Sequence, residues 1–191
     1  LELFRRVDGH MSGHAEMNHV PGVDMSTGSL GQGISVAVGM ALAGKVDKKS
    51  YRVYALMGDG EIAEGQAWEA FLAASKYELD NLCVIVDVNG LQIDGPTKAV
   101  MPTEPLDEKL EAFGFKVLKA DGHSFPALQE AFAAAKTVKG QPTVILAKTV
   151  KGKGVSFMEN DAGWHGKAPA EAQYEQASAE LHAHLAELEA M

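Results

Sequence analysis

Short apolar runs and longer stretches with helical spacing alternate along this chain of 191 residues. Four apolar runs have the length of strands, at residues 53–57, 82–88, 115–120 and 143–147. Helical patterns occupy residues 34–44, 64–77, 106–113, 125–136 and 171–190. Strands that alternate with helices form a mostly parallel sheet with helices on both faces. The pattern therefore predicts a single α/β domain over residues 1–191, built as three α/β/α layers around a mostly parallel central sheet.

The same pattern predicts which side chains form the core. Residues 34–44 are small and apolar almost throughout, and a helix that is apolar all round is expected to be buried. In the next helix Trp68, Phe71 and Leu72 follow helical spacing and are predicted to be core residues. Residues 91–105 contain a Gly-Pro pair and two further prolines, so we expect a loop, and loops of this length are usually functional.

Two successive strands are expected to end in polar residues that suit a cation. The first ends in Gly-Asp-Gly, with Asp59 at its centre, and the second ends in Asn89-Gly90. In a right-handed parallel crossover both strand ends open onto the same edge of the sheet, so Asp59 and Asn89 are expected to converge there. Carboxylate and amide oxygens are ligands that Mg²⁺ or Ca²⁺ accepts. The spacing therefore predicts a cation site at this edge.

A phosphate group is expected to share the site with the cation. Two protein oxygens are too few for a closed cage, and Mg²⁺ usually completes its octahedron with water and phosphate oxygens. Gly58 and Gly60 flank Asp59 and would let a diphosphate approach the backbone, while amides at Gly60 and at the helix start near Glu61 would bind its oxygens. The glycine-rich residues 26–33 precede the apolar helix and favour either a further phosphate site or close helix packing, and the pattern leaves both open.

Other polar residues have structural interpretations. Glu61 and Glu64 fall in the first turn of a predicted helix, where carboxylates complement the helix dipole. His123 lies in a turn before a helix that Ser124 is expected to cap, and we interpret this histidine as a turn residue. Residues 1–25 are predicted to be a loop. This loop holds three histidines, at His10, His14 and His19, whose spacing matches no closed zinc pattern, so an exposed or cleft-lining loop is favoured.

Composition and charge exclude several classes of protein. Asp and Glu total 26 against 17 Lys and Arg, and no basic patch indicates binding to nucleic acid or to an anionic membrane. Cys83 lies in an apolar run, is expected to be buried, and as a single cysteine excludes an intrachain disulfide. No apolar run reaches the length of a membrane span and no signal peptide opens the chain, so we expect a cytoplasmic protein. The chain begins at Leu1, and we expect an amino-terminal segment to be missing.

Several segments together resemble transketolase. A Gly-Asp-Gly turn followed, after the next strand, by an asparagine is the signature of thiamine-diphosphate enzymes. The likeness extends through STGSLGQGISVAVGMALA, GDGEIAEGQAWEA, VDVNGLQIDGPT, AKTVKGKGVSFMEN and WHGKAP, which occur in the same order and cover nearly the whole chain. The chain looks most like the amino-terminal subunit of a transketolase that is split into two polypeptides. The resemblance implies the diphosphate-binding domain of the thiamine-diphosphate-binding fold.

The resemblance also implies the ligands of the cation and the contacts of the cofactor. Asp59 and the side chain of Asn89 would bind Mg²⁺ or Ca²⁺, with the backbone carbonyl of Leu91 as a third protein ligand. Gly60 would bind the diphosphate of thiamine diphosphate through its amide, and Ile93 would pack against the thiazolium ring. The glycine-rich segment would line the cofactor with Gly28, Ser29 and Leu30.

The reaction implied by the resemblance is the transfer of a two-carbon ketol unit from a ketose phosphate to an aldose phosphate. His165, in a long polar loop, would contact the diphosphate and the substrate oxygen, and His14 would face the substrate. Histidine suits proton transfer near neutral pH. Glu64 would join a carboxylate network between subunits. His14 stands in a GHAE motif where the family has GHPE, so Ala15 replaces a proline.

The chain by itself would hold an incomplete catalytic site. In the family, the glutamate that protonates the aminopyrimidine and most residues that bind the sugar phosphate belong to a second domain. We therefore expect a partner, the carboxy-terminal transketolase subunit with the pyrimidine-binding domain, in a hetero-tetramer. Two alternatives remain: a related synthase of the deoxyxylulose-phosphate type, against which the LQIDGPT and WHGKAP segments argue, and a non-catalytic cofactor-binding module, against which the presence of Asp59, Asn89 and His165 argues.

Overall fold

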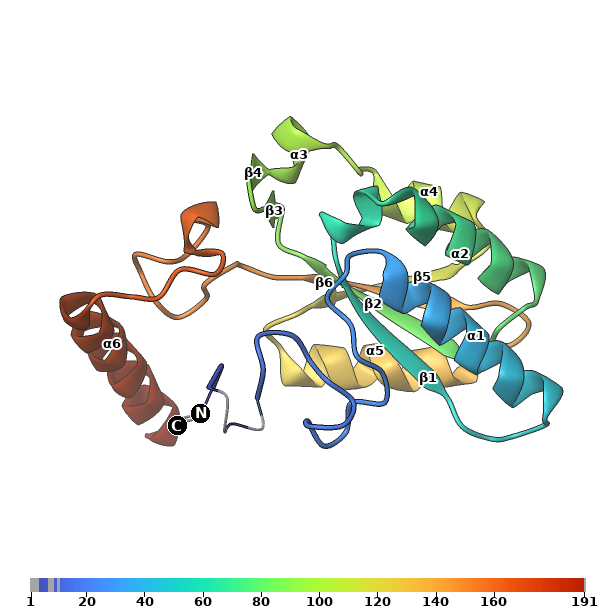
Figure 1. Cartoon of the computed structure of the whole chain (residues 1–191), viewed down its shortest axis with the longest axis horizontal. Coiled ribbons are helices and arrows are strands. Elements are labelled where there is room, and N and C mark those ends of the chain that lie inside the picture. Colours follow the sequence, from blue (N-terminus) through green and yellow to red (C-terminus); the bar gives the residue numbers. More distant parts are fainter. Residues whose placement is uncertain (1–3, 7–8, 10, 191) are drawn as a thin grey trace.

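The computed structural model describes residues 4–6, 9 and 11–190. Four strands, β1 (Val53–Gly58), β2 (Leu82–Val88), β6 (Thr143–Lys148) and β5 (Lys116–Asp121), form a sheet in the order β1-β2-β6-β5. Each neighbouring pair is parallel. Helices α1 (Gln32–Val46), α2 (Gly65–Lys76) and α4 (Leu106–Ala112) lie on one face, and α5 (Phe125–Thr137) lies on the other (Figure 1). The predicted three-layer α/β/α architecture with a parallel sheet is confirmed.

Two apolar clusters join these layers. The larger lies between the sheet and the helices of the first face, and its largest fully buried side chain is Phe71. The Phe71 ring makes edge-to-face contacts with Trp68 and Phe115, at centroid distances of 5.7 and 5.2 Å, which adds directional attraction to the burial of area. The smaller cluster lies under α5 and contains Cys83, which is fully buried as predicted, so this thiol is a core residue.

Two predictions of burial are wrong, and for one reason. Helix α1 buries one face, comprising Ile34, Ala37, Val38, Ala41 and Gly44, while Gly39 and Ala43, inside the segment predicted to be buried all round, are exposed. In α2, Phe71 is fully buried but its neighbour Leu72 is 59% exposed, because the buried positions follow Ala67, Ala70 and Ala74 around the helix. Apolar character allows a side chain to be buried. Only the side chains on the helix face that packs against the rest of the domain are buried in fact.

Residues 91–105 are more regular than the predicted loop. They contain a two-residue antiparallel pair, β3 (Leu91–Gln92) with β4 (Gly95–Pro96), and the short helix α3 (Thr97–Val100). Two single 3₁₀ turns, η1 (Glu61–Ala63) and η2 (Ala162–Trp164), complete the elements of the described residues apart from one last helix. Helix α5 begins as predicted after Ser124, whose hydroxyl accepts a hydrogen bond from the amide of Ala127 at 3.3 Å.

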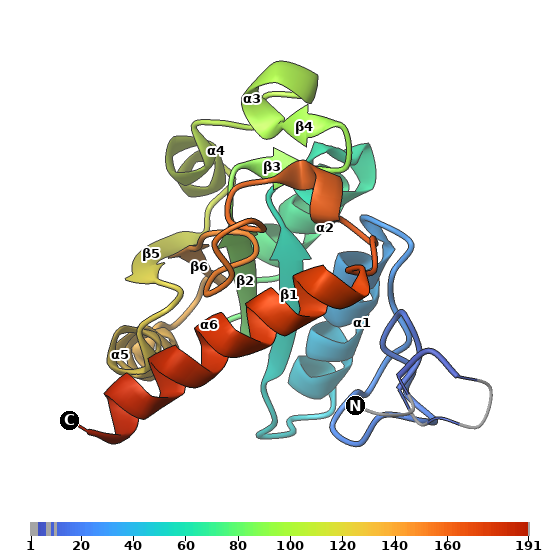
Figure 2. The same ribbon diagram turned by 90° about the vertical axis from the view of Figure 1, so that its left-hand side faces the viewer.

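That last helix, α6 (Glu171–Glu189), stands apart from the body of the domain (Figure 1), and Figure 2 views the molecule from the side on which it lies. It has no buried residue, and the side chains of its predicted apolar face are exposed, at Tyr174, Leu181, Leu185 and Leu188. Among residues 4–6, 9 and 11–190, no helix has both the length and the apolar composition that a membrane span requires.

Substitutions at two adjacent positions of α2, Phe71 and Leu72, can test which side chains form the core. Replacing Phe71 with alanine removes a fully buried ring and leaves a cavity, so we expect the free energy of unfolding to fall by about 3–5 kcal/mol. Leu72→Ala is the matched control, expected to cost about 0.5 kcal/mol or less, because this side chain is mostly exposed. Urea denaturation followed by circular dichroism measures both. Similar losses for the two variants would contradict this assignment of the core.

Candidate cofactor and cation site

Asp59 follows β1 directly and is almost completely buried, with 3% of its surface exposed. One carboxylate oxygen, Oδ2, accepts a hydrogen bond from the amide of Gly90 at 2.6 Å, and the other, Oδ1, accepts one from the amide of Gly60 at 2.9 Å. The hydroxyl of Thr103 donates to the carbonyl of Asp59 at 3.3 Å. The turns that end β1 and β2 therefore meet at one point, as the parallel crossover predicted.

Asn89 follows β2 and is oriented by its neighbours. Its side-chain oxygen accepts a hydrogen bond from the amide of Leu91 at 2.9 Å, and its side-chain nitrogen donates to Oδ1 of Asp87 at 3.2 Å. The hydroxyl of Thr149 also donates to Oδ1 of Asp87. Sequence reasoning missed this positioning carboxylate. Its one signal was a charged residue inside an otherwise apolar strand.

The electrostatics of this edge favour a cation. Burial raises the pKa of Asp59 above its ordinary value, the amides of Gly90 and Gly60 lower it, Asp87 raises it further, and Lys148 lowers it. None of the ion pairs among the described residues involves Asp59. Within the same residues no group of three or more His, Cys, Asp and Glu side chains could hold a metal. A cation here would therefore need oxygens from water or phosphate, and an amide oxygen such as that of Asn89 keeps a second lone pair for it.

The amide of Gly60, which is expected to meet a diphosphate, and that of Gly58 on the other side of Asp59 already have partners within the chain. Gly60 donates to Asp59, and Gly58 donates to Oε2 of Glu61 at 3.2 Å. A Cβ atom at Gly60 would also lie only 2.8 Å from Cβ of Gln92, so packing against β3 requires glycine there. A diphosphate that binds the amide of Gly60 would have to share it with Asp59.

The glycine loop, residues 28–33, leads into α1 beside this edge. Gly28 has a φ of 133°, and a Cβ atom on it would lie 2.2 Å from the imidazole of His14, so the two residues are in close contact. Leu30 is 52% exposed. A cavity of about 530 Å³ opens here, lined by residues that include His14, Ser29 and Gln32. The structure thus brings His14 into contact with the glycine loop, at the edge of this cavity.

Glu61 and Glu64 differ from their prediction as first-turn residues of a helix. Glu61 lies in η1, before α2, and its Oε1 atom accepts a hydrogen bond from the amide of Gly31 at 3.0 Å. Glu64 is the residue at which α2 is capped, but its side chain makes no capping bond and is exposed. A Cβ atom on Gly31 would lie 2.7 Å from Cβ of Glu64. Both glutamates therefore adjoin the glycine loop, which local helix signals do not reveal.

His165 and Ile93 lie on segments that approach one another. His165 directly follows η2 and is exposed, and η2 packs against β4. Ile93, between β3 and β4, is 64% exposed. No hydrogen bond of the His165 side chain occurs among the described residues. Its neighbour Trp164 is fixed, because the indole nitrogen donates to the carbonyl of Phe157 at 2.9 Å.

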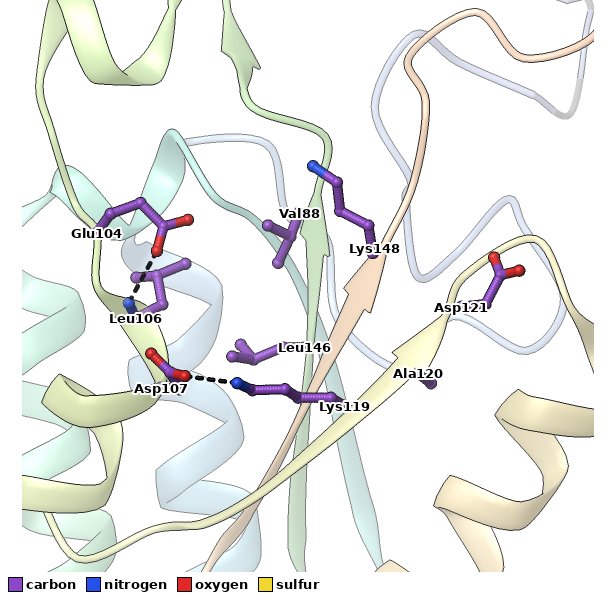
Figure 3. A pocket seen from close by; sticks show the side chains of 9 residues that line it. All are labelled: Val88, Glu104, Leu106, Asp107, Lys119, Ala120, Asp121, Leu146 and Lys148. Carbon is purple, nitrogen blue, oxygen red and sulfur yellow. Dashed lines mark hydrogen bonds and ion pairs between the residues drawn. The ribbon is translucent and has the colours of Figure 1, made fainter.

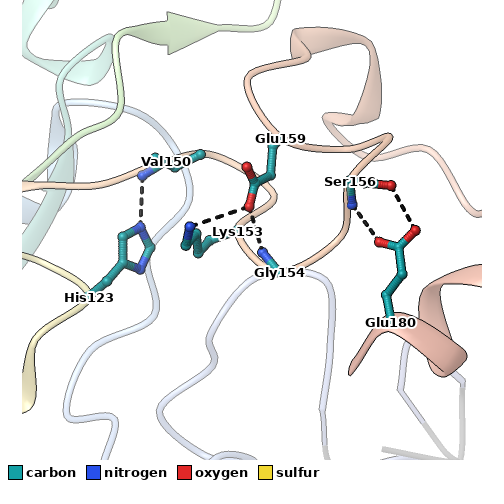
Figure 4. Close-up of polar contacts among 7 residues, drawn as sticks. All are labelled: His123, Val150, Lys153, Gly154, Ser156, Glu159 and Glu180. Carbon is teal, nitrogen blue, oxygen red and sulfur yellow. Dashed lines mark hydrogen bonds and ion pairs between the residues drawn. The ribbon is translucent and has the colours of Figure 1, made fainter. Parts of the chain in front are cut away.

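The long loop that carries His165 is held by side-chain acceptors (Figure 4). Nε2 of His123 accepts from the amide of Val150 at 2.8 Å, which supports the structural role predicted for this histidine. Glu159 accepts from the amide of Gly154 at 3.0 Å. Glu180 of α6 accepts hydrogen bonds from the backbone amide and the hydroxyl of Ser156, at 2.6 and 2.7 Å. The hydrogen bond from the backbone amide is the main cause that holds the pKa of Glu180 below its ordinary value.

A second cavity, of about 430 Å³, lies at the carboxyl ends of β2, β6 and β5 (Figure 3). Val88, which precedes Asn89, lines it together with Lys148 and Asp121. An ion pair between Lys119 and Asp107 crosses its wall. No motif or spacing in the residues indicated this cavity.

The amino-terminal histidines show no metal site in the described part of the chain. His19 contacts Glu16, with 2.8 Å between Nδ1 and Oε2, and both side chains are about half exposed. His14 contacts Gly28 instead. His10 lies outside the described residues.

Comparison with known proteins gives the family. The family model of the transketolase thiamine diphosphate binding domain matches residues 1–186. An apulose-4-phosphate transketolase subunit from Phocaeicola vulgatus is 44% identical over 94% of this chain, and a 6-deoxy-6-sulfo-D-fructose transketolase subunit from a Clostridium species is 43% identical over 95%. The chain spans 63% and 66% of the lengths of these two relatives. Human transketolase is 42% identical over 95% of this chain, which covers 29% of that protein.

Solved structures agree with the sequence relatives. Transketolase from Campylobacter jejuni aligns with a TM-score of 0.84 and 33% identity, over 94% of this chain and 29% of that one. The Pichia stipitis transketolase in complex with sedoheptulose-7-phosphate aligns with the same TM-score and 30% identity, over 95% of this chain and 28% of that one. Because the family model covers nearly the whole sequence and the relatives agree with it, the chain belongs to the family of transketolase thiamine-diphosphate-binding domains.

Proposed function

We propose that this chain is the thiamine-diphosphate-binding subunit of a two-polypeptide transketolase. It transfers a two-carbon ketol unit from a ketose phosphate to an aldose phosphate, and it is active only with the carboxy-terminal subunit that carries the pyrimidine-binding domain. The observation that carries the proposal is the meeting of Asp59 with the Asn89-Gly90 turn beside the glycine loop. Similarity over nearly the whole chain to relatives that are named as transketolase subunits supports the division into two polypeptides.

Each part of the edge has a role in this proposal. Asp59, the side chain of Asn89 and the carbonyl of Leu91 hold Mg²⁺ or Ca²⁺, which neutralises the diphosphate. The amide of Gly60 binds the diphosphate, and the glycine loop with Leu30 lines the cofactor. When bound, thiamine diphosphate supplies a nucleophilic carbon and an electron sink for breaking and forming carbon–carbon bonds.

The histidines are proposed to act on protons and on substrate oxygens. His165 directly follows η2, which packs against β4, and Ile93, which is proposed to pack against the thiazolium ring, lies between β3 and β4. His14 contacts the glycine loop at Gly28 and is proposed to face the substrate. Imidazole can take up or release a proton near neutral pH, which suits both positions to ketol transfer.

A partner would complete the site at the surface where these residues are exposed. Leu30 and Ile93 are more than half exposed although both are apolar and are proposed to contact the cofactor. Glu64 is also exposed, beside Gly31, where it would reach the carboxylate network of a second polypeptide. A hetero-tetramer, with each cofactor enclosed between subunits, would cover these side chains and exclude water.

Ketol transfer should therefore require both polypeptides. Mixed with its carboxy-terminal partner, thiamine diphosphate and Mg²⁺, the chain should transfer a ketol unit, and either polypeptide alone should not. The assay should follow product formation by mass spectrometry over a panel of donor substrates, most of them ketose phosphates. The panel should include apulose-4-phosphate and 6-deoxy-6-sulfo-D-fructose, after which two relatives are named, and pyruvate.

The panel separates the competing functions. Turnover of pyruvate without turnover of ketoses would replace the proposal with a synthase of the deoxyxylulose-phosphate type. Tight cofactor binding by the complex without turnover of any substrate in the panel would indicate a non-catalytic module.

The cation assignment can be tested at Asp59. Because a direct ligand is lost, Asp59→Ala should weaken Mg²⁺-dependent binding of thiamine diphosphate to the two-subunit complex by about a hundredfold or more. Isothermal titration calorimetry, with and without a chelator, measures this loss. Asp47→Ala, at an exposed residue after α1, is the control and should bind as wild type does. Equal affinity of wild type and Asp59→Ala, with circular dichroism showing both folded, would refute the assignment.

A further inference from the structure

One glutamate joins the two backbone segments that are proposed to bind the cofactor. Oε1 of Glu61 accepts a hydrogen bond from the amide of Gly31 in the glycine loop, at 3.0 Å. Oε2 accepts one from the amide of Gly58, at the end of β1 and next to Asp59, at 3.2 Å. One of these N–H groups precedes α1 in the chain and the other follows it. A single carboxylate therefore sets the distance between the two segments.

The packing of the surrounding residues places Glu61 between these amides. η1 is anchored by Ile62, which is fully buried, so the turn cannot rotate its first residue away. Gly31 has a φ of 77°, and any side chain on it would collide with Glu64, whose Cβ atom would lie 2.7 Å from the added one. The backbone of the glycine loop therefore comes close enough for its amide to reach the carboxylate.

A second set of hydrogen bonds joins the same part of the chain to α2. The side-chain nitrogen of Gln32, in the first turn of α1, donates to the side-chain oxygen of Gln66 in α2 at 2.6 Å. The side-chain nitrogen of Gln66 in turn donates to the hydroxyl of Ser35 at 2.9 Å. The start of α1 is thus tied to the start of α2, which leaves the bonds of Glu61 to determine how the glycine loop faces the turn at Asp59.

We propose that the side chain of Glu61 is a positioning group, which holds the glycine loop against the Asp59 turn before the cofactor binds, and that its carboxylate does not itself touch the cofactor. Both carboxylate oxygens bond to amides of the chain, and a carboxylate facing a diphosphate would repel it. With the loop already in place, less conformational entropy is lost on binding. This inference rests on the proposed function, because it assumes that thiamine diphosphate binds at this edge.

The two hydrogen bonds of the Glu61 carboxylate predict which substitutions at this position weaken cofactor binding most. Glutamine keeps the length of the side chain but has one acceptor oxygen, and its NH₂ group would face the second amide N–H, so one of the two bonds is lost. Aspartate is one methylene shorter and cannot reach both amides. Glu69→Gln is the matched control, because Glu69 is an exposed residue of α2 whose side chain makes no hydrogen bond among the described residues.

The test uses the full chain in complex with its partner polypeptide. Calorimetric titration with thiamine diphosphate in saturating Mg²⁺ should show the dissociation constant rising about tenfold in Glu61→Gln and at least as much in Glu61→Asp, as expected for the loss of a hydrogen bond to a charged group. The kcat at saturating cofactor should change by less than about twofold, because Glu61 does not touch the reacting groups, and Glu69→Gln should match wild type. Hydrogen exchange without cofactor should be faster at Gly31 or Gly58 in the Glu61 variants.

Several results would overturn the positioning role. Unchanged cofactor affinity in Glu61→Gln would refute it, whether or not exchange at the two glycine amides is faster. A large fall in kcat with unchanged affinity would show that Glu61 acts on the reacting groups instead. A wild-type complex that binds no thiamine diphosphate would refute the proposed function and the positioning role together, whereas normal wild-type binding with unaltered Glu61 variants would refute the positioning role alone.

Discussion

The burial of Asp59 at the carboxyl edge of a parallel sheet constrains the structure around it. A buried carboxylate is costly unless hydrogen bonds or a counter-charge compensate it. The amides of Gly60 and Gly90 supply two such bonds, and each comes from a turn that must approach closely. These bonds do not remove the whole cost, because burial still raises the pKa of Asp59. A divalent cation bound there, as proposed, would compensate the remaining cost.

Carboxylates that accept hydrogen bonds from N–H groups fix several loops of this structure. Glu61 joins the glycine loop to the end of β1, Asp87 orients Asn89, and Glu180 fixes the loop that carries His165 through Ser156. The glycine loop and the His165 loop have few buried apolar side chains of their own. Directional hydrogen bonds therefore contribute much to fixing their positions, beside a few packing contacts such as that between Phe157 and Trp164. Such bonds to charged groups are individually stronger than neutral ones.

Several exposed apolar side chains lie on the loops of the proposed site and on α6. Scattered exposed apolar residues are normal on a protein surface. Here Leu30 and Ile93 lie on the loops of the proposed site, and α6 carries further exposed apolar residues without burying any. The sheet and its helices form a complete core, whereas the surface around the site is left open. This division suits a chain that supplies the anchoring half of a site and a partner that encloses it.

The layers, the parallel crossover and the convergence of Asp59 with the Asn89-Gly90 turn could be predicted from the residues alone. Strand length, helical spacing and polar strand ends are local signals, and the handedness of the crossover is general. The exposure of Leu72, the hairpin at residues 91–96 and the bonds from Glu61 to the glycine loop became visible only in three dimensions. These features depend on which surfaces pack together and on hydrogen bonds between segments far apart in the chain, and neither leaves a periodic pattern in the residues.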